Sequence, residues 1–105
     1  MIKLVGFVRR RGDLNRQAFV EHWTGPHASI AKRLPGVRGY TINVLPDAND
    51  SGFDGIYEMW FDSQDDLDRA RNSTVMQEEL PADRPKFLSY WVSFVADERR
   101  MVEVG

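Results

Sequence analysis

The order of apolar segments along the chain constrains the fold more than any other feature. Four segments have the composition of β-strands, and two segments between them have helical periodicity. The predicted strands are residues 2–9, 38–45, 56–61 and 86–96, and the predicted helices begin near residues 16 and 64. The resulting order, β-α-β-β-α-β, is the split βαβ arrangement. We therefore predict an α+β fold, a ferredoxin-like sandwich with one four-stranded antiparallel sheet.

Capping residues mark where both helices begin. Asn15 suits the N-cap of the first helix, and Leu14 and Phe19 have the spacing of a hydrophobic staple. Ser63 and Asp66 are spaced as a capping box, which predicts the start of the second helix.

Breaks and short elements are predicted from proline and from local composition. Pro26, which follows Gly25, lacks a backbone donor and would clash with the carbonyl of His22, so we expect a kink or short break there. Farther along, we expect a helical turn near residues 75–80 and a short extra strand within residues 99–104.

The predicted strands are apolar on both faces. An antiparallel strand with one solvated face should alternate apolar and polar residues, and two helices cover only one face of a sheet. We therefore expect a homodimer in which the second faces pack sheet on sheet; the alternative is a sheet with some exposed aromatic residues. The residues that break the alternation are Leu4, Val5, Phe7, Val8, Leu88, Tyr90, Trp91, Val92 and Phe94.

The first helix carries a histidine within its apolar stripe. The stripe consists of Phe19, Trp23, His27, Ile30 and Leu34. Burial can tune the pKa of such a histidine near neutrality, which favours His27 as an acid–base residue. The alternative is a buried histidine satisfied by a backbone carbonyl, or one that caps the restarted helix. His22 lies on the flank of the stripe, and two histidines five residues apart on an α-helix point in different directions, so no metal pair is predicted.

A carboxylate in the third strand is a possible companion for His27. Alternation places Glu58 on one face with Ile56 and Trp60, where a carboxylate needs a partner. Glu58 either hydrogen-bonds His27 and acts as a second catalytic residue, or pairs with an arginine such as Arg38.

Aromatic and polar side chains provide candidates for substrate binding. Large rings can line a pocket for a flat apolar ligand, and tyrosine hydroxyls can donate to a substrate oxygen; the alternative is that these residues only build the core. The candidates are His22, Trp23, Tyr40, Tyr57, Trp60 and Phe94.

Composition excludes several classes of function. Lys and Arg number 14 against 16 Asp and Glu, a net charge of −2, whereas nucleic-acid binding needs a basic excess. The absence of cysteine excludes disulfides, thiolate nucleophiles and cysteine-ligated metals. Neither a membrane-spanning stretch nor the pattern of a signal peptide is present. We expect one domain over residues 1–105 in a reducing cytoplasm, with no nucleic-acid or membrane partner.

Four motifs carry a family resemblance: Phe19-x-x-His22-Trp23-x-x-x-His27, Leu34-Pro35-Gly36-Val37-x-x-Tyr40, Asp54-Gly55 and Glu58-x-Trp60-Phe61-Asp62-Ser63. At these residues the sequence resembles the EthD family, within the dimeric α+β barrel superfamily.

The resemblance implies a dimer whose sheets form a barrel and a ligand cleft between the helices and the concave sheet face. Similar proteins include a protein of ether degradation, cofactor-independent isomerases of methylated muconolactones, and decarboxylases or cyclases of aromatic polyketides. The family's acid–base histidine corresponds to His27.

Two kinds of function remain after these exclusions: cofactor-free chemistry by one histidine, and ligand binding without chemistry. No P-loop, dinucleotide or nucleophile-elbow motif is present. Our first hypothesis is a lyase or isomerase without cofactor or metal, acting on a small, largely apolar carbonyl, lactone or phenolic compound, with His27 shuttling a proton and Glu58 tuning it. The alternatives are a non-catalytic module that holds a hydrophobic metabolite for an oxygenase, a cofactor-independent monooxygenase, and a purely structural dimer.

Overall fold

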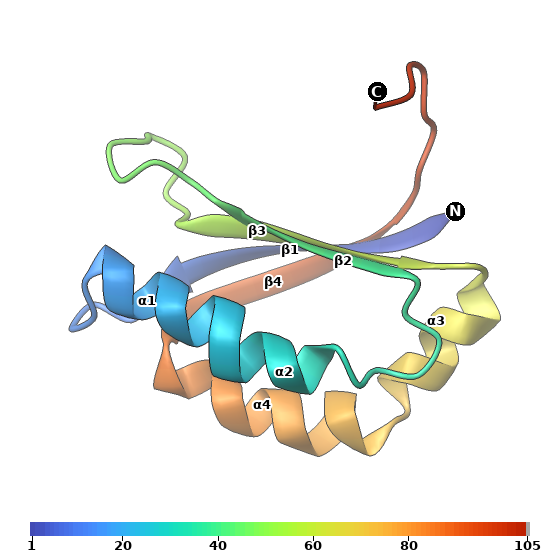
Figure 1. The fold of residues 1–105 in the computed structure, drawn as a ribbon, viewed down its shortest axis with the longest axis horizontal. Helices are drawn as coiled ribbons and strands as arrows, with labels where there is room; N and C mark the ends of the chain where they lie inside the picture. Colours follow the sequence, from blue (N-terminus) through green and yellow to red (C-terminus); the bar gives the residue numbers. More distant parts are fainter. Residues whose placement is uncertain (105) are drawn as a thin grey trace.

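The computed structural model, described for residues 1–104, has one four-stranded antiparallel sheet with all of its helices on one face (Figure 1). The order of strands across the sheet is β2-β3-β1-β4. This arrangement confirms the predicted ferredoxin-like α+β sandwich. The strands are β1 (Ile2–Arg10), β2 (Gly39–Val44), β3 (Gly55–Phe61) and β4 (Leu88–Asp97).

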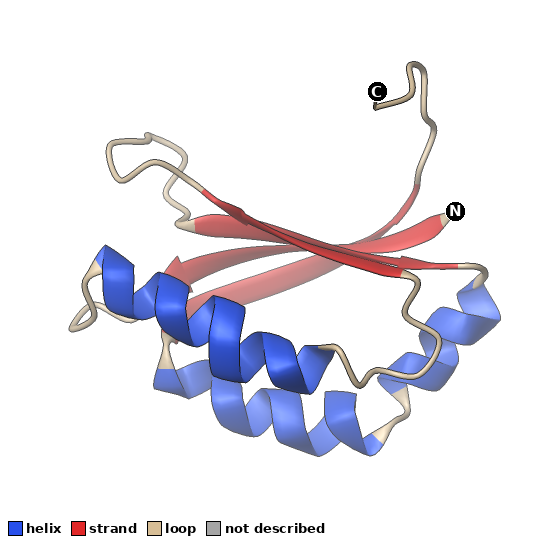
Figure 2. Ribbon diagram, viewed as in Figure 1, coloured by secondary structure: helices blue, strands red, loops and turns tan. Residues whose placement is uncertain are grey.

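The helices form two rods beneath the sheet, as Figure 2 shows. The first rod is α1 (Arg16–His22), the π-helix η1 (Trp23–His27) and α2 (Ala28–Ala31). The second rod is the π-helix η2 (Val75–Glu79), α4 (Leu80–Asp83) and the 3₁₀-helix η3 (Arg84–Lys86), and α3 (Gln64–Arg71) precedes it in the chain.

Both predicted caps are present. The side chain of Asn15 accepts a hydrogen bond from the backbone N–H of Ala18 at 2.8 Å. The hydroxyl of Ser63 likewise accepts from the backbone N–H of Asp66 at 3.2 Å, which starts α3. Local sequence therefore determines where these two helices begin.

The predicted kink or short break at Pro26 takes the form of a π-turn, which interrupts the α-helix between α1 and α2 without ending the rod. Ala28 donates its backbone N–H to the carbonyl of Trp23, five residues back. A π-turn contains one more residue than an α-turn, so the helix continues past a proline that cannot donate a hydrogen bond.

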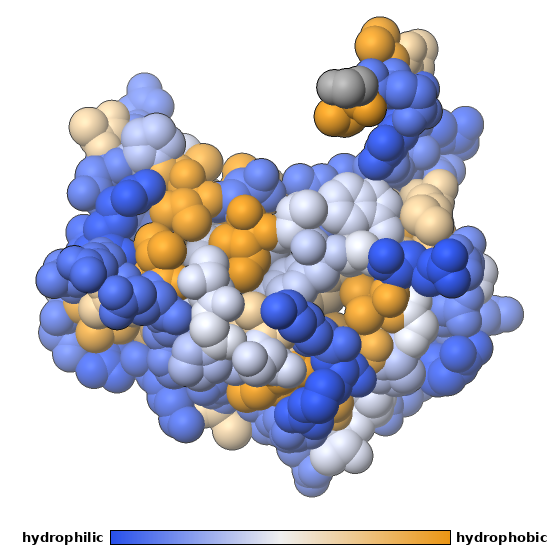
Figure 3. Space-filling model, viewed as in Figure 1, coloured by the Kyte–Doolittle hydropathy of each residue, from blue (hydrophilic) through white to orange (hydrophobic). Residues whose placement is uncertain are grey.

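The core lies between the sheet and the helices and forms two clusters. One is built around Leu4, Met59, Phe61, Leu67 and Leu80, and the other around Val8, Phe19, Trp23, Phe87 and Leu88. Figure 3 shows the molecular surface in the same view as Figure 1. Apolar residues are visible there between the polar surfaces of the helices and the strands. The predicted stripe of the first helix faces this core, and His27 is buried with it.

The opposite face of the sheet has no helix over it. Apolar side chains nevertheless occupy it: Phe94 is 57% exposed and Tyr90 is 44% exposed. Phe7 packs against Phe94 at 6.3 Å between ring centroids, and Phe53 covers Phe7 at 5.4 Å. We refer to this surface, which also carries Val5, Ile56, Glu58, Trp60 and Val92, as the open face.

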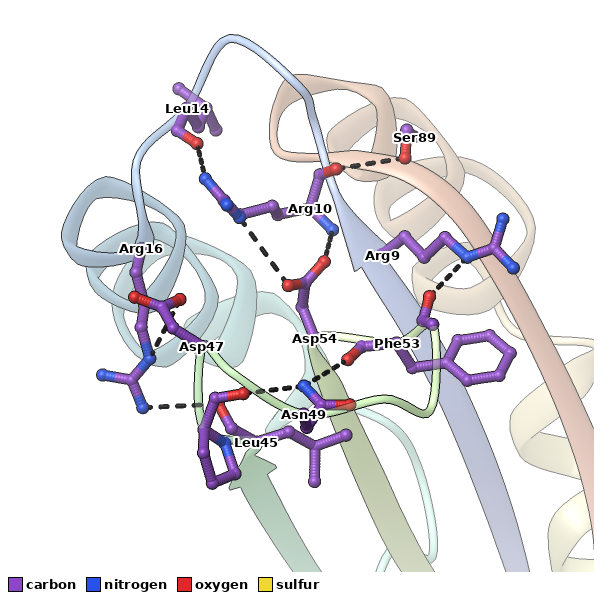
Figure 4. Close-up of polar contacts among 12 residues, drawn as sticks. Arg9, Arg10, Leu14, Arg16, Leu45, Asp47, Asn49, Phe53, Asp54 and Ser89 are labelled. Atoms are coloured by element: carbon purple, nitrogen blue, oxygen red, sulfur yellow. Dashed lines mark hydrogen bonds and ion pairs between the residues drawn. The ribbon is translucent and has the colours of Figure 1, made fainter.

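A loop at one end of the sheet rises beside the open face. Asp54 holds residues 45–54 to β1 by accepting a hydrogen bond from the backbone N–H of Arg10 at 2.8 Å (Figure 4). Arg9 donates from Nε to the carbonyl of Gly52 at 2.6 Å. These contacts explain how a long polar loop keeps a defined position.

The chain after β4 rises at the other end of the sheet, and the extra strand predicted within residues 99–104 is not formed (Figure 1). Asp97 is paired with Ile2, which is the first residue of β1. The backbone N–H of Glu98 still donates to the carbonyl of Met1 at 3.0 Å, and no strand follows it in the described part of the tail. Met101, Val102 and Val104 are instead exposed on this tail.

Two glycines on the helix-facing side of the sheet make room for aromatic rings. A Cβ at Gly6 would lie 1.9 Å from a ring carbon of Tyr57, and a Cβ at Gly55 would lie 2.2 Å from a ring carbon of Trp23. Both rings can therefore lie directly on the backbone of the sheet only because these positions lack a side chain.

We predict that Gly55→Ala destabilises the protein by about 1–3 kcal/mol, because the buried ring of Trp23 has to move. Gly12→Ala is the control, since nothing lies within 4 Å of its Cβ position, and we expect a change within about 0.5 kcal/mol. Urea unfolding of both variants measures the difference, and equal stabilities would contradict the account.

Candidate functional site

Two histidines and one aspartate meet beneath the sheet. Nδ1 of His27 lies 2.8 Å from Oδ2 of Asp83, and Nε2 of His22 lies 2.9 Å from the same oxygen. Asp83 is only 5% exposed. A buried carboxylate is costly unless it is hydrogen-bonded, and here two imidazoles of the first helical rod supply the donors.

The π-turn η1 is the local reason that both imidazoles reach one carboxylate. On a regular α-helix, residues five apart are rotated by roughly 140° from each other. The additional residue in the turn reduces this rotation, so His22 and His27 lie on the same side. The sequence-based expectation that they point in different directions is wrong for this reason.

Phe87 supports both imidazoles. Its ring is fully buried, and its centroid lies 4.8 Å from that of His22 and 4.7 Å from that of His27. The His22 side chain is 25% exposed, whereas that of His27 is 10% exposed. Of the two histidines, His27 therefore occupies the drier environment.

The charges of this cluster follow from burial and hydrogen bonding. Burial by itself raises the pKa of Asp83, but the hydrogen bonds from His22 and His27 outweigh it, and the net pKa lies below its usual value. Burial lowers the pKa of His27, and the nearby charges of Arg84 and His22 lower it further, while Asp83 opposes them. Asp83 is thus ionised and His27 neutral at pH 7.

The neutral tautomer of His27 is determined by its partner. An ionised carboxylate only accepts hydrogen bonds, so Nδ1 carries the proton that is donated to Asp83. Nε2 is left with a free lone pair and has no partner among residues 1–104. Within this range no fully buried polar side-chain atom lacks a partner, so Nε2 reaches water-accessible space.

That space is a cavity between the helices and the sheet. Its empty volume is about 390 Å³, open solvent at the mouth included. The centre of a water molecule can move through about 20 Å³ of it, so a larger ligand has to displace lining side chains. The lining residues are Val8, Trp23, His27, Tyr40, Tyr57, Met59, Met76, Leu80, Arg84, Leu88 and Trp91.

Two tyrosines give this cavity hydroxyl groups. Burial raises the pKa of Tyr40 and of Tyr57, so both phenols stay protonated at neutral pH. Each is therefore available to donate a hydrogen bond to a ligand oxygen beside the lone pair of His27.

The structure brings together four of the eight residues that the sequence nominated. His27, Trp23, Tyr40 and Tyr57 line the cavity, and His22 adjoins it through Asp83.

Glu58, Trp60 and Phe94 do not join them, because they lie on the open face. Glu58 accepts a hydrogen bond from Nζ of Lys3 at 2.8 Å, so neither the predicted contact with His27 nor the alternative pair with Arg38 is formed. Strand alternation is the reason: Tyr57 faces the helices, so its neighbour Glu58 faces away.

Sequence reasoning missed Asp83. One signal was available, because Leu80, Asp83 and Phe87 have the three- and four-residue spacing of an apolar helical stripe, and all three are buried. A carboxylate on such a stripe needs a hydrogen-bond donor, and a buried histidine such as His27 can supply one. The neighbouring prolines at 81 and 85 obscured that periodicity.

Within residues 1–104, no group of three or more His, Asp or Glu side chains is arranged to hold a metal ion. No helix in the same range has the length and apolar character needed to cross a membrane.

Comparison with known proteins identifies the family. The EthD domain matches residues 11–90, which include both histidines and Asp83. This chain belongs to the EthD family. A comparison with curated proteins finds no match.

Solved structures show the same fold in other EthD and ferredoxin-like proteins. An EthD family protein from Bacillus halodurans is 24% identical, with a TM-score of 0.79 over 94% of this chain and 99% of its own. A dimeric ferredoxin-like protein of unknown function from Thermobifida fusca is 13% identical, with a TM-score of 0.71 over 90% and 88%. The cofactor-independent oxygenase SnoaB from Streptomyces nogalater is 18% identical, with a TM-score of 0.68 over 96% and 95%.

We predict that Asp83→Asn lowers the pKa of His27 further, because the variant loses the carboxylate charge that favours the imidazolium. An NMR titration of the imidazole signals measures this shift. Asp68→Asn, which removes an exposed carboxylate from α3, is the matched control and should leave the titration unchanged. An unaltered His27 titration in Asp83→Asn would contradict the assigned pairing.

Proposed function

We propose that this EthD-family protein is a cofactor-free acid–base enzyme of the lyase or isomerase type. Its substrate would be a small, largely apolar carbonyl, lactone or phenolic compound. The observation that carries the proposal is the free Nε2 of His27 in an apolar cavity, with Nδ1 held by Asp83. This combination is what a general base requires: an available lone pair, a fixed orientation and a counter-charge for the protonated state.

In the proposed reaction, His27 accepts at Nε2 a proton from a carbon next to the substrate carbonyl, or from a phenol. The electron pair left behind moves onto the substrate oxygen, to which Tyr40 or Tyr57 donates a hydrogen bond. Asp83 stabilises the imidazolium that forms. Return of the same proton to another atom of the substrate completes an isomerisation. In an elimination, the electron pair returns from the oxygen and expels a leaving group, which takes the proton from Nε2 of His27.

His22 has a positioning role in this proposal. Its hydrogen bond to Oδ2 of Asp83, the same oxygen that His27 contacts, fixes the carboxylate against His27. A carboxylate with two donors rotates less freely than one with a single donor, so the imidazole of His27 is held in one orientation.

A second candidate is a cofactor-independent oxygenase, favoured by the similarity in fold to SnoaB. The same base would deprotonate an electron-rich phenol before it reacts with oxygen. Oxygen consumption with a hydroquinone distinguishes this reaction from isomerisation. A binding protein without turnover would show ligand affinity and no product.

We predict that His27→Gln lowers turnover by about 10²–10⁴-fold, because the variant has no basic nitrogen at Nε2. Wild-type kcat/KM should also fall as the pH is lowered through the pKa of His27, which lies below 6.5, since protonation removes the lone pair. A product screen with aromatic carbonyls and lactones identifies the substrate for both measurements.

Glu58→Gln is the matched control for this experiment, because Glu58 lies on the open face and contacts Lys3. We expect it to retain turnover. Wild-type turnover in His27→Gln would overturn the assignment of the base.

We also propose that two copies of the chain associate through the open face. The support is the set of exposed apolar side chains on this face and the description of ferredoxin-like structural neighbours as dimeric. The cavity lies on the other side of the sheet, so each copy would keep its own site.

We predict that Phe94→Glu gives a monomer, because it places a charge among the apolar side chains of the open face. Ser29→Glu adds the same charge on the exposed side of α2 and should leave the assembly unchanged. Sedimentation velocity measures both, and a wild-type monomer would contradict the proposal.

A further inference from the structure

Arg84 carries an uncompensated positive charge at the cavity of His27. It is the first residue of η3 and is half-buried. Its Nη2 lies 3.7 Å from the sulfur of Met76, and its guanidinium carbon lies 5.9 Å from the ring centroid of Trp91. Both neighbours also line the cavity, so the guanidinium sits at its wall.

Within residues 1–104 no carboxylate forms an ion pair with Arg84. The adjacent carboxylate of Asp83 is instead used by His22 and His27, with Nζ of Lys86 3.8 Å from its other oxygen. Exposed arginines are common, but Arg84 is half-buried. Its guanidinium has five N–H donors, and its described neighbours, a thioether and an aromatic ring, provide no strong acceptor.

The charge on the side chains that line the cavity is therefore positive, with the ionised Asp83 behind His27. Among its described lining residues, Arg84 is the one with a permanent charge. The two tyrosines are protonated and His27 is neutral at pH 7. An anionic oxygen that enters would find a charge-assisted donor in Arg84 without displacing an existing partner.

We infer that this cavity selects small apolar compounds that carry an anionic oxygen, such as a carboxylate or a phenolate, with Arg84 binding the anion. This inference rests on the proposed function, since it names the class of substrate for the same site. The anion at Arg84 would direct the apolar remainder of the compound between Trp91 and Met76 and toward Nε2 of His27. The alternative role for Arg84 is to cover the ring of Trp91 by a cation–π contact alone.

Benzoate and benzyl alcohol are suitable probes, because they have similar shapes and differ in charge. Titration of each into wild-type protein, followed by the NMR signals of the His27 imidazole, gives the two affinities. We expect benzoate to bind about 10–100-fold more tightly than benzyl alcohol at pH 7. Bound benzoate should also raise the pKa of His27, since a nearby anion favours the imidazolium.

Arg84→Met should remove this preference, because it keeps an unbranched side chain and loses the charge. Arg84→Lys should retain part of it, since lysine keeps the charge but cannot bind a carboxylate with two parallel hydrogen bonds. Arg69→Met is the matched control: Arg69 is an exposed arginine of α3 paired with Asp66, and the variant should bind both probes as wild type does.

Equal affinities of wild type for the two probes, absence of saturable benzoate binding, or unchanged selectivity in Arg84→Met would each overturn the inference. The first two tests need no variant, so they hold even where Arg84→Met fails to fold. Failure of the proposed function has a different signature. In that case His27→Gln keeps its turnover while the preference for benzoate still depends on Arg84.

Discussion

The hydrogen bonds that Asp83 accepts from His22 and His27 are the interaction on which the rest of the site depends. A carboxylate this deeply buried needs compensation, and the donors come from a helix more than fifty residues earlier in the chain. The pair of bonds joins the first helical rod to the end of the second. It also determines which nitrogen of His27 carries the proton, and so which nitrogen faces the cavity. The packing of the two rods, the tautomer of His27 and the charge of Asp83 all follow from these two hydrogen bonds.

Local backbone features make this arrangement possible. The π-turn around Pro26 places both histidines on one side of their helix. Gly6 and Gly55 let the rings of Tyr57 and Trp23 lie on the sheet, where a side chain would otherwise fill the space. The cavity is thus built from a proline that widens a helix and from glycines that leave room for aromatic rings. None of these residues performs chemistry, yet each decides where a reactive or polar group lies.

The two faces of the sheet carry different sets of side chains. The helix-facing side carries the cavity with His27 and Arg84, and the open face carries apolar side chains together with the Glu58–Lys3 pair. Alternation along β3 explains why Tyr57 belongs to the first set while Glu58 and Trp60 belong to the second. Residues adjacent in sequence therefore contribute to different surfaces, and a site proposed from both sets cannot form within one copy of the chain.

Local periodicity and local hydrogen bonds made three features predictable before folding: the order of strands and helices, the caps at Asn15 and Ser63, and the apolar stripe that buries His27. Which face of the sheet meets the helices, and which carboxylate meets the histidines, became evident only from the folded chain. Both depend on contacts between segments far apart in the chain. Asp83 lies in a short, proline-flanked helical segment, and its partner becomes evident only when that segment packs against the first helix.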